Sequence, residues 1–226
     1  MSALAELTEE IIKCRACPRL VEWREKVARE KRAAFADEEY WGRPVPGFGD
    51  PRARMLIVGL APAAHGGNRT GRIFTGDRSG DWLFASLHRC GFANQPLSVH
   101  RGDGLRLIDS YIAAAVRCAP PDNKPTIEER DRCRPYLVRE FKALTRVRVV
   151  VALGSFAWDT CLRVHVERGG TRLRPKPRFG HGAEAALGDQ ILIGSFHPSQ
   201  QNTFTGKLTE TMLDAVFTRA RALISR

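Results

Sequence analysis

Four short apolar runs, separated by segments with helical character, most constrain how this chain can fold. The apolar runs occupy residues 54–59, 111–117, 147–153 and 190–196. The helix-like segments that follow them occupy residues 80–90, 126–144, 154–164 and 207–224. Strands that alternate with helices indicate βαβ units, in which a parallel sheet carries helices on both faces. We therefore predict an α/β fold, a three-layer α/β/α arrangement around a central four-stranded parallel sheet.

The turns that follow the four apolar runs are polar or rich in glycine. In chain order they read GLAPAAHGG, CAPPDN, GSFA and HPSQQN. Because the carboxyl ends of parallel strands meet at one edge of a sheet, we expect a single shared site there. In the last turn His197 precedes a proline, which favours extended backbone and projects the histidine from the strand end. A lone histidine is more often structural than catalytic, but its position between a strand and a helix favours a function.

Length and charge restrict the class of protein. The 226 residues are 43% hydrophobic, which is enough for one domain over 1–226. No run approaches the ~18 apolar residues of a membrane span, and the first residues begin an amphipathic helix rather than a signal peptide. We expect a cytoplasmic protein without a membrane partner. A net charge of +11 indicates a polyanionic partner, most simply nucleic acid, although an arginine-rich proteome would give the same balance.

Four of the six cysteines form a pattern typical of metal ligands. Cys14 and Cys17 interrupt the helix-like residues 3–30 as a C-x2-C pair, and Cys118 and Cys133 are separated by fourteen residues. Four thiolates suit either tetrahedral zinc or a [4Fe-4S] cluster, and the long second spacing, which is not a zinc knuckle, favours iron–sulfur. The alternative is that these cysteines are small buried hydrophobic residues. Cys90 and Cys161 have no partner by spacing and are predicted to be core residues.

The glycine-rich segment 59–80 contains neither nucleotide-binding glycine motif. Its glycines instead allow the backbone to approach a ligand closely. Phe74 within it either stacks on a base or anchors the loop to the core. Asp77 either caps the following helix or orients water. Asn123, in the turn CAPPDN, is either a turn residue or the partner of a nucleobase edge.

These residues resemble the uracil-DNA glycosylase superfamily. The segments GLAPAAHGGNRTGRIFTGDRSG (59–80) and HPSQQN (197–202) resemble the two signature motifs of its family 5 enzymes, and CAPPDNKP resembles the base-reading segment. The cysteine spacing is similar to the [4Fe-4S] ligands shared by families 4 and 5. The resemblance implies an enzyme that flips a deaminated nucleotide out of DNA and hydrolyses its N-glycosidic bond. It also implies that the cluster ties down the N-terminal segment.

The resemblance assigns a role to each of these residues. Phe74 would stack on the base, Asn123 would bind its polar edge, and His197 would donate to the pyrimidine O2, where negative charge gathers. Ala61 and Gly66 would also lie against the substrate. The implied DNA contacts are Ser199, Gln200, Asn202 and Lys207. The implied cluster ligands are Cys14, Cys17, Cys118 and Cys133.

One departure from the other families affects the water. They place an acidic or polar residue just before the proline of the first motif, where this chain has Leu60 and Ala61. Neither side chain can activate water, so the expected catalytic carboxylate is Asp77, with Asn68 and His65 as further candidates. A site without a strict general base should accept more substrates. We therefore predict release of hypoxanthine and of oxidised or alkylated pyrimidines besides uracil.

Two other classes of protein remain open. A non-catalytic iron–sulfur DNA-binding or redox protein on the same fold would have the same charge and cysteines. A zinc-dependent base deaminase would need an H-x-E element before the cysteine pair, and the sequence has none. The leading interpretation is a monomeric repair glycosylase of prokaryotic cytoplasm and nucleoid, acting on DNA that contains uracil or other deaminated bases.

Overall fold

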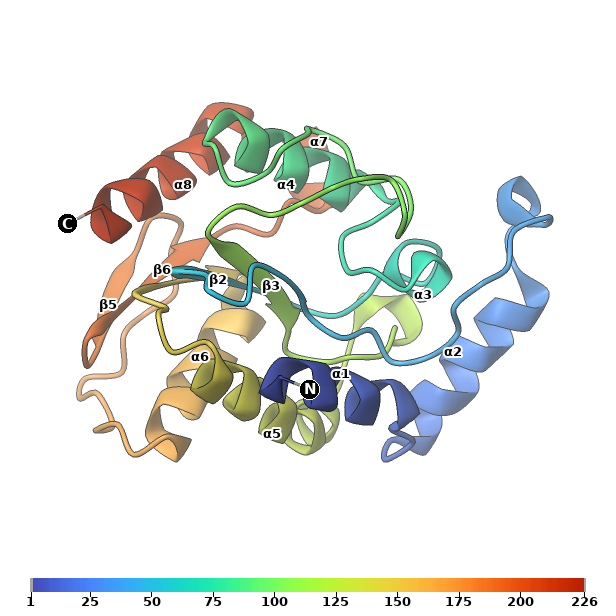
Figure 1. Cartoon of the computed structure of the whole chain (residues 1–226), viewed down its shortest axis with the longest axis horizontal. Helices are drawn as coiled ribbons and strands as arrows, with labels where there is room; N and C mark the ends of the chain where they lie inside the picture. Colours follow the sequence, from blue (N-terminus) through green and yellow to red (C-terminus); the bar gives the residue numbers. More distant parts are fainter. Residues whose placement is uncertain (1, 226) are drawn as a thin grey trace.

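A computed structural model describes residues 2–225, with one sheet between two layers of helices (Figure 1). The strands are β1 (Phe48–Gly49), β2 (Met55–Gly59), β3 (Ser110–Ala114), β4 (Val149–Leu153), β5 (Glu184–Leu187) and β6 (Gln190–Ser195). Their order in the sheet is β1-β3-β2-β4-β6-β5. The α/β class is as predicted. The predicted four-stranded parallel sheet is corrected, because β1 and β5 add antiparallel edges and make the sheet six-stranded and mixed.

The two added strands gave little signal in the sequence. Strand β1 is only two residues long, and β5 is a mostly exposed run of one glutamate, two alanines and a leucine. The inner strands are different because helices cover both of their faces. Ile57 of β2, for example, pairs with Ile112 of β3 and Val151 of β4, and all three are fully buried.

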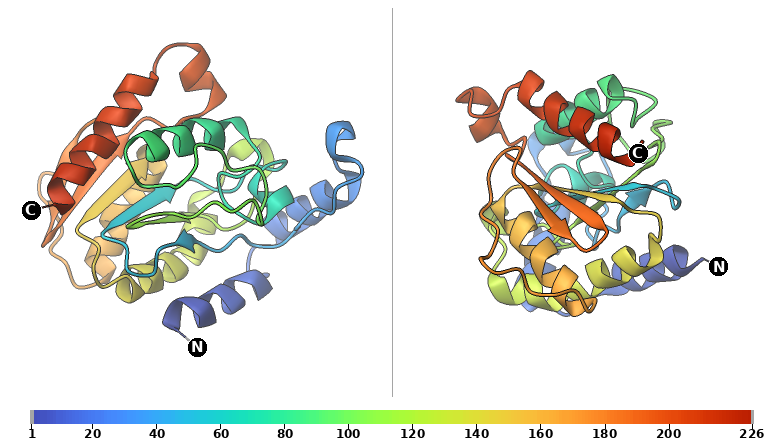
Figure 2. Two further views of the ribbon diagram at one scale, coloured as in Figure 1. Left: turned by 45° about the horizontal axis from the view of Figure 1, so that its top comes forward. Right: turned by 90° about the vertical axis from the view of Figure 1, so that its left-hand side faces the viewer.

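Each face of the sheet has its own hydrophobic core. One core packs α4 (Arg78–Arg89) and α8 (Glu210–Ile224) against the sheet, and the other packs α5 (Ile127–Ala143) and α6 (Ser155–Glu167) against the opposite face. Figure 2 shows these two layers on either side of the strands. Helix α1 (Ala3–Lys13) packs against α5. Among the residues described, no helix is long and apolar enough to cross a membrane.

The predicted helices are present, with shifts at their ends. The interruption at 14–17 separates α1 from α2 (Pro18–Glu30), which projects to one side of the sheet (Figure 1). Thr126 caps α5 by the expected capping box with Glu129. The last helix begins at Glu210 rather than at 207 because Thr209 is its N-cap. Shorter elements that were not predicted are η1 (Ala33–Phe35), α3 (Gly67–Thr70), η2 (Pro121–Asn123) and α7 (Gln200–Phe204).

A buried ion pair joins the segment that follows β3 to helix α5. Arg117 donates to the carboxylate of Glu140 on α5, and both residues are 1% exposed. Losing one partner of such a pair typically costs about 3–5 kcal/mol, because an uncompensated charge stays buried. The pair therefore fixes how the segment after β3, which carries Cys118, sits on α5.

Candidate active site at the carboxyl edge of the sheet

The loops that follow β2 and β6 come together across the end of β4. The ring centroids of Phe74 and His197 are 5.7 Å apart and the rings are inclined by 33°. A Cβ on Gly59 would lie 2.7 Å from the Phe74 ring, so the ring occupies the space that a side chain there would need. The expected meeting of the first motif with the HPSQQN turn at one sheet edge is therefore observed for these two residues.

Phe74 is held in a conformation that aromatic residues rarely adopt. Its φ is +54° and its side chain is 5% exposed, within the core that faces α4. A bulky residue in the left-handed region costs free energy that surrounding contacts must offset. The burial supports the anchoring role, and the closeness to His197 puts the same ring at the floor of the candidate site.

His197 is half-buried, and burial lowers its pKa to about 4. The imidazole is therefore neutral at pH 7, and among residues 2–225 no hydrogen bond occupies either ring nitrogen. Its backbone carbonyl accepts a 2.9 Å hydrogen bond from the side-chain amide of Asn202. Gly154, whose φ is +97°, lies beside it, with a built Cβ 3.7 Å from the His197 Cβ. A neutral ring with a free nitrogen can donate one hydrogen bond to a ligand.

Asp77 lies at the N-terminus of α4 and has the predicted capping role. One carboxylate oxygen accepts a 3.0 Å hydrogen bond from the Gly80 amide, which caps the helix. The other oxygen lies over Gly66, where a Cβ would come within 2.1 Å of it. Burial raises the pKa of Asp77 to about 6. The structure thus brings Gly66 and Asp77 into direct contact, and a carboxyl with this pKa is mostly ionised at pH 7.

The other predicted residues are more dispersed. Asn123 is exposed in the left-handed region, with φ +55°. Ala61 packs against the small cluster of Leu20, Val116 and Cys118. Ser199 caps α7 by accepting from the Asn202 amide at 3.4 Å. Gln200 and Lys207 are exposed, and the Lys207 ammonium lies 5.0 Å from the centre of the Phe196 ring.

Three contacts at the site were not foreseen. The Tyr40 hydroxyl and His65 Nδ1 are 3.0 Å apart, which joins the aromatic segment before β1 to the first motif. Arg69 is buried beneath the loop that carries Asp77. Arg78 stacks at 4.6 Å on Phe204, which is 66% exposed at the end of α7. These are long-range contacts of loops, for which the sequence offers no periodicity.

The four predicted metal ligands line one cavity. It lies between α2, the segment after β3 and α5, and its lining includes Cys14, Cys17, Cys118 and Cys133. Arg24, which is 2% exposed, donates to the Cys118 Sγ at 2.9 Å. The Arg117 amide donates to the Cys133 Sγ at 3.3 Å. Over residues 2–225, however, no three Cys, His, Asp or Glu side chains converge tightly enough to hold a single metal ion.

Unpartnered donors test whether this cavity suits an anionic group. Arg24 Nε, Arg117 Nε and Arg117 Nη1 are buried without a hydrogen-bond partner, and both arginines line the cavity. Buried guanidinium groups require compensating negative charge. Glu140 already pairs with Arg117, and four thiolates would supply negative charge and acceptors to the remaining donors, so the lining fits an anionic group held by the four cysteines.

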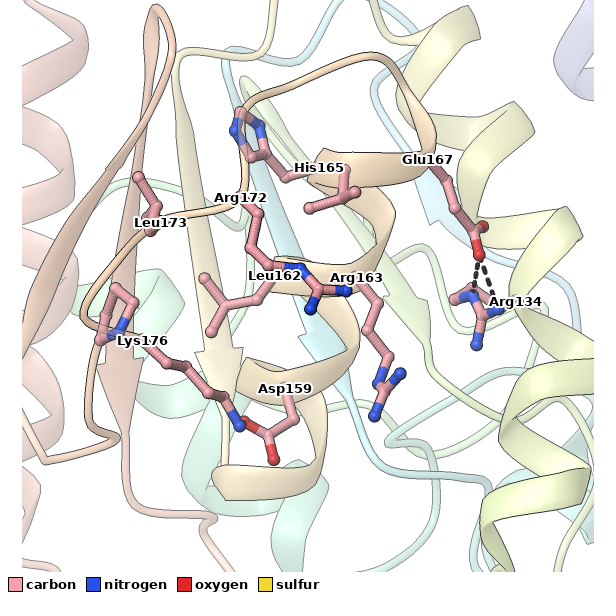
Figure 3. Close-up of a pocket in the computed structure, with 11 residues that line it drawn as sticks. Arg134, Asp159, Leu162, Arg163, His165, Glu167, Arg172, Leu173 and Lys176 are labelled. Carbon is pink, nitrogen blue, oxygen red and sulfur yellow. Dashed lines mark hydrogen bonds and ion pairs between the residues drawn. The ribbon is translucent and has the colours of Figure 1, made fainter.

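A separate cleft of about 320 Å³ lies between α6 and the segment 172–177 (Figure 3). Its two acids are already neutralised, because Asp159 pairs with Lys176 at 2.7 Å and Glu167 with Arg134 at 2.6 Å. None of the predicted site residues lines it. The cleft therefore offers no free carboxylate for hydrolysis, and the candidate active site remains at the strand ends.

Comparison with known proteins gives matches along almost the whole chain. The family model described as the uracil DNA glycosylase superfamily matches residues 46–221. A type-5 uracil-DNA glycosylase of Mycobacterium bovis is 57% identical over 98% of this chain and 82% of its own length. One from Thermus thermophilus is 53% identical over 93% of each chain. A type-4 uracil-DNA glycosylase of Archaeoglobus fulgidus is 31% identical over 70% of this chain and 62% of its own.

Replacing Asp77 by asparagine is expected to stabilise the fold at neutral pH. The folded-state pKa of about 6 lies above the ordinary value of 3.8. The contribution of the Asp77 carboxyl to stability is therefore fully present below pH 3.8 and is lost as the pH rises through 6. An asparagine side chain keeps a capping oxygen, so Asp77→Asn should raise the free energy of unfolding by roughly 1–3 kcal/mol at pH 8.

Urea unfolding of both proteins between pH 4 and pH 8 measures this difference. It should grow with pH up to about 7 and then level off. A difference that is independent of pH would show that the Asp77 pKa is not raised in the folded protein.

Proposed function

The chain belongs to the type-5 branch of the uracil-DNA glycosylase superfamily, and we propose that it hydrolyses the N-glycosidic bond of uracil at the edge where β2 and β6 end. It is a DNA-repair glycosylase whose substrate is DNA. The observation that carries the assignment of the site is the pairing of His197 with Phe74 across this edge, with Asp77 ending the same loop as Phe74. Family membership favours this enzyme over the non-catalytic alternative.

A base reaches this site only after it leaves the DNA stack. Flipping is cheapest for mismatched nucleotides, which gives part of the selectivity. The Phe74 ring would then lie against the flipped base, and Asn123, which is exposed on a separate turn, would approach its polar edge. Exposed Gln200 and Lys207 and the basic residues 172–178 support contact with the flanking phosphates.

His197 would stabilise the departing base as a neutral hydrogen-bond donor. As the C1′–N bond breaks, its electron pair stays with the base and negative charge gathers on O2. A pKa of about 4 keeps the imidazole neutral, so it donates to the oxygen without being an acid that must lose a proton. Because Asn202 holds the backbone carbonyl of His197, the ring needs little reorganisation during the reaction.

Asp77 would act on the sugar side of the reaction. Its ionised carboxylate packs over Gly66, whose missing side chain leaves room for it. Water adds to C1′ and loses a proton to Asp77 or to solvent, while the negative carboxylate stabilises the oxocarbenium-like sugar. Leu60 and Ala61 cannot take this part, which leaves Asp77 as the carboxylate of the first motif.

His197→Ala is expected to lower single-turnover release of uracil by about 10²–10³-fold, the usual effect of removing a donor aimed at developing charge. Binding to a duplex with an uncleavable lesion should change little, because the donor acts mainly in the transition state. His88→Ala, on the last turn of α4, is a matched control that should keep full activity. Unchanged release by His197→Ala would remove the catalytic assignment.

We also propose that the enzyme releases hypoxanthine and damaged pyrimidines. The support is the absence of a polar side chain at residues 60 and 61, so that water is positioned less strictly than by a dedicated base. Purified protein, incubated with duplexes that contain uracil, hypoxanthine or an oxidised pyrimidine and then with alkali, should break the strand at each lesion. Cleavage confined to uracil would refute the broad specificity.

We further propose that Cys14, Cys17, Cys118 and Cys133 hold a [4Fe-4S] cluster. The support is their shared cavity and its buried, partly unpartnered arginines. When bound, the cluster supplies a covalent link between the N-terminal helices and the body of the domain, and no step of the hydrolysis passes through it. We expect the enzyme to act as a monomer on chromosomal DNA in the cytoplasm.

The purified protein should therefore be brown, with about four iron atoms per chain. Cys118→Ser should lose iron and visible absorption, because serine oxygen is a poor substitute for thiolate. Cys90→Ser, which lies outside the cavity, is the control and should keep both. A colourless protein that contains one zinc ion would contradict the proposal.

A further inference from the structure

A buried arginine fastens together the two ends of the loop that carries Asp77. Arg69 Nε donates to the carbonyl of His65 at 2.8 Å, and Arg69 Nη2 donates to the carbonyl of Gly76 at 3.0 Å. His65 directly precedes Gly66, and Gly76 directly precedes Asp77. One planar guanidinium therefore connects the backbone just before Gly66 with the backbone just before Asp77, and these two residues are in contact.

The local backbone is built around this contact. Gly76 has a φ of +69°, which favours glycine, and a Cβ there would lie 2.3 Å from Arg69 Nη2. A side chain at residue 76 would thus expel the guanidinium. Thr70, the next residue after Arg69, adds a second tie, because its hydroxyl lies 3.2 Å from the carbonyl of Gly66.

Arg69 is itself held from the N-terminal side. Its guanidinium is 7% exposed, pairs with the carboxylate of Glu38, and lies 3.9 Å from the centre of the Phe35 ring. Planar stacking and a charge-assisted hydrogen bond leave it little rotational freedom. Residues 35–38 follow α2, so the segment beyond the cysteine-bearing region covers the base of the catalytic loop.

Several groups act on the charge of Asp77. Burial raises the pKa of Asp77 most, and Asp81 on α4 raises it further. Arg69 on α3 lowers it, as do the amides of Gly80 and Ser79. The Arg78 guanidinium lies on the Phe204 ring, and His197 on the opposite wall is neutral. The two amides lower the pKa of Asp77 more than Arg69 does, so the main contribution of Arg69 is to the geometry of the loop.

We propose that Arg69 is a positioning residue for catalysis, which fixes the Asp77 carboxylate over Gly66 by bonding the carbonyls of His65 and Gly76. It does so without touching the DNA, since it is buried beneath the loop. The inference rests on the proposed function of Asp77 as the carboxylate on the sugar side of the reaction. Substitutions of Arg69 should consequently lower the rate of base release and leave DNA affinity unchanged.

Three variants separate the charge of Arg69 from its geometry. Arg69→Gln removes the guanidinium that bridges the two carbonyls, and should lower the plateau of the single-turnover rate about ten- to a hundredfold. Arg69→Lys keeps the charge but loses the planar fork that bonds both carbonyls, so its plateau should fall by a similar factor. Glu38→Gln leaves both carbonyl bonds in place, and its plateau should stay near that of the wild type.

Uracil release by each variant is measured from pH 5 to pH 9, together with thermal unfolding and affinity for an uncleavable duplex. If Arg69→Gln does not fold, the plateau rate of Arg69→Lys tests the proposal instead. A plateau rate equal to that of the wild type would overturn the proposal. A wild-type plateau in folded Arg69→Gln would also overturn it. Asp77→Asn distinguishes a failure of the Arg69 proposal from a failure of the proposed role of Asp77. If Asp77→Asn keeps the wild-type pH–rate profile, the role of Asp77 itself is refuted.

Discussion

The site depends on backbone that lacks side chains at two points of close approach. At Gly59 the missing side chain leaves room for the Phe74 ring, which places that ring beside His197. At Gly66 it leaves room for the Asp77 carboxylate. A methyl group at either position would overlap the group now there, at 2.7 Å and 2.1 Å respectively. Glycine here does more than allow turns, because it determines how closely the aromatic floor and the carboxylate can lie to the strand ends.

Charge burial is the second constraint, and it divides the molecule into two regions. At the strand edge, burial raises the pKa of Asp77 and lowers that of His197, which gives one ionised and one neutral group at pH 7. In the cysteine cavity, Arg24 and Arg117 are buried, and each keeps at least one donor without a partner although Glu140 pairs with Arg117. Both arrangements lower stability relative to an apolar core; the first suits the proposed hydrolysis and the second suits the proposed cluster.

The sequence predicted the fold class, the inner strands and the convergence of two motifs, because these follow from apolar runs and strand polarity. It missed the edges, since β1 is two residues long and β5 has no buried alternating pattern. It named Asp77, Phe74 and His197, but Arg69 was beyond its reach. Nothing in the sequence shows that a guanidinium four residues after His65 will bond carbonyls at both 65 and 76. Such contacts depend on how an irregular loop closes on itself, which periodicity does not describe.

The central claim is that an ionised Asp77 and a neutral His197 act together. The pH dependence of single-turnover uracil release by the wild-type enzyme tests it most directly. Because His197 is already neutral above about pH 4 and Asp77 ionises near pH 6, the rate should rise through pH 6 and then stay level toward pH 8. A rate that falls as the pH rises through 6 to 7 would show that a protonated group is required, and would contradict the account.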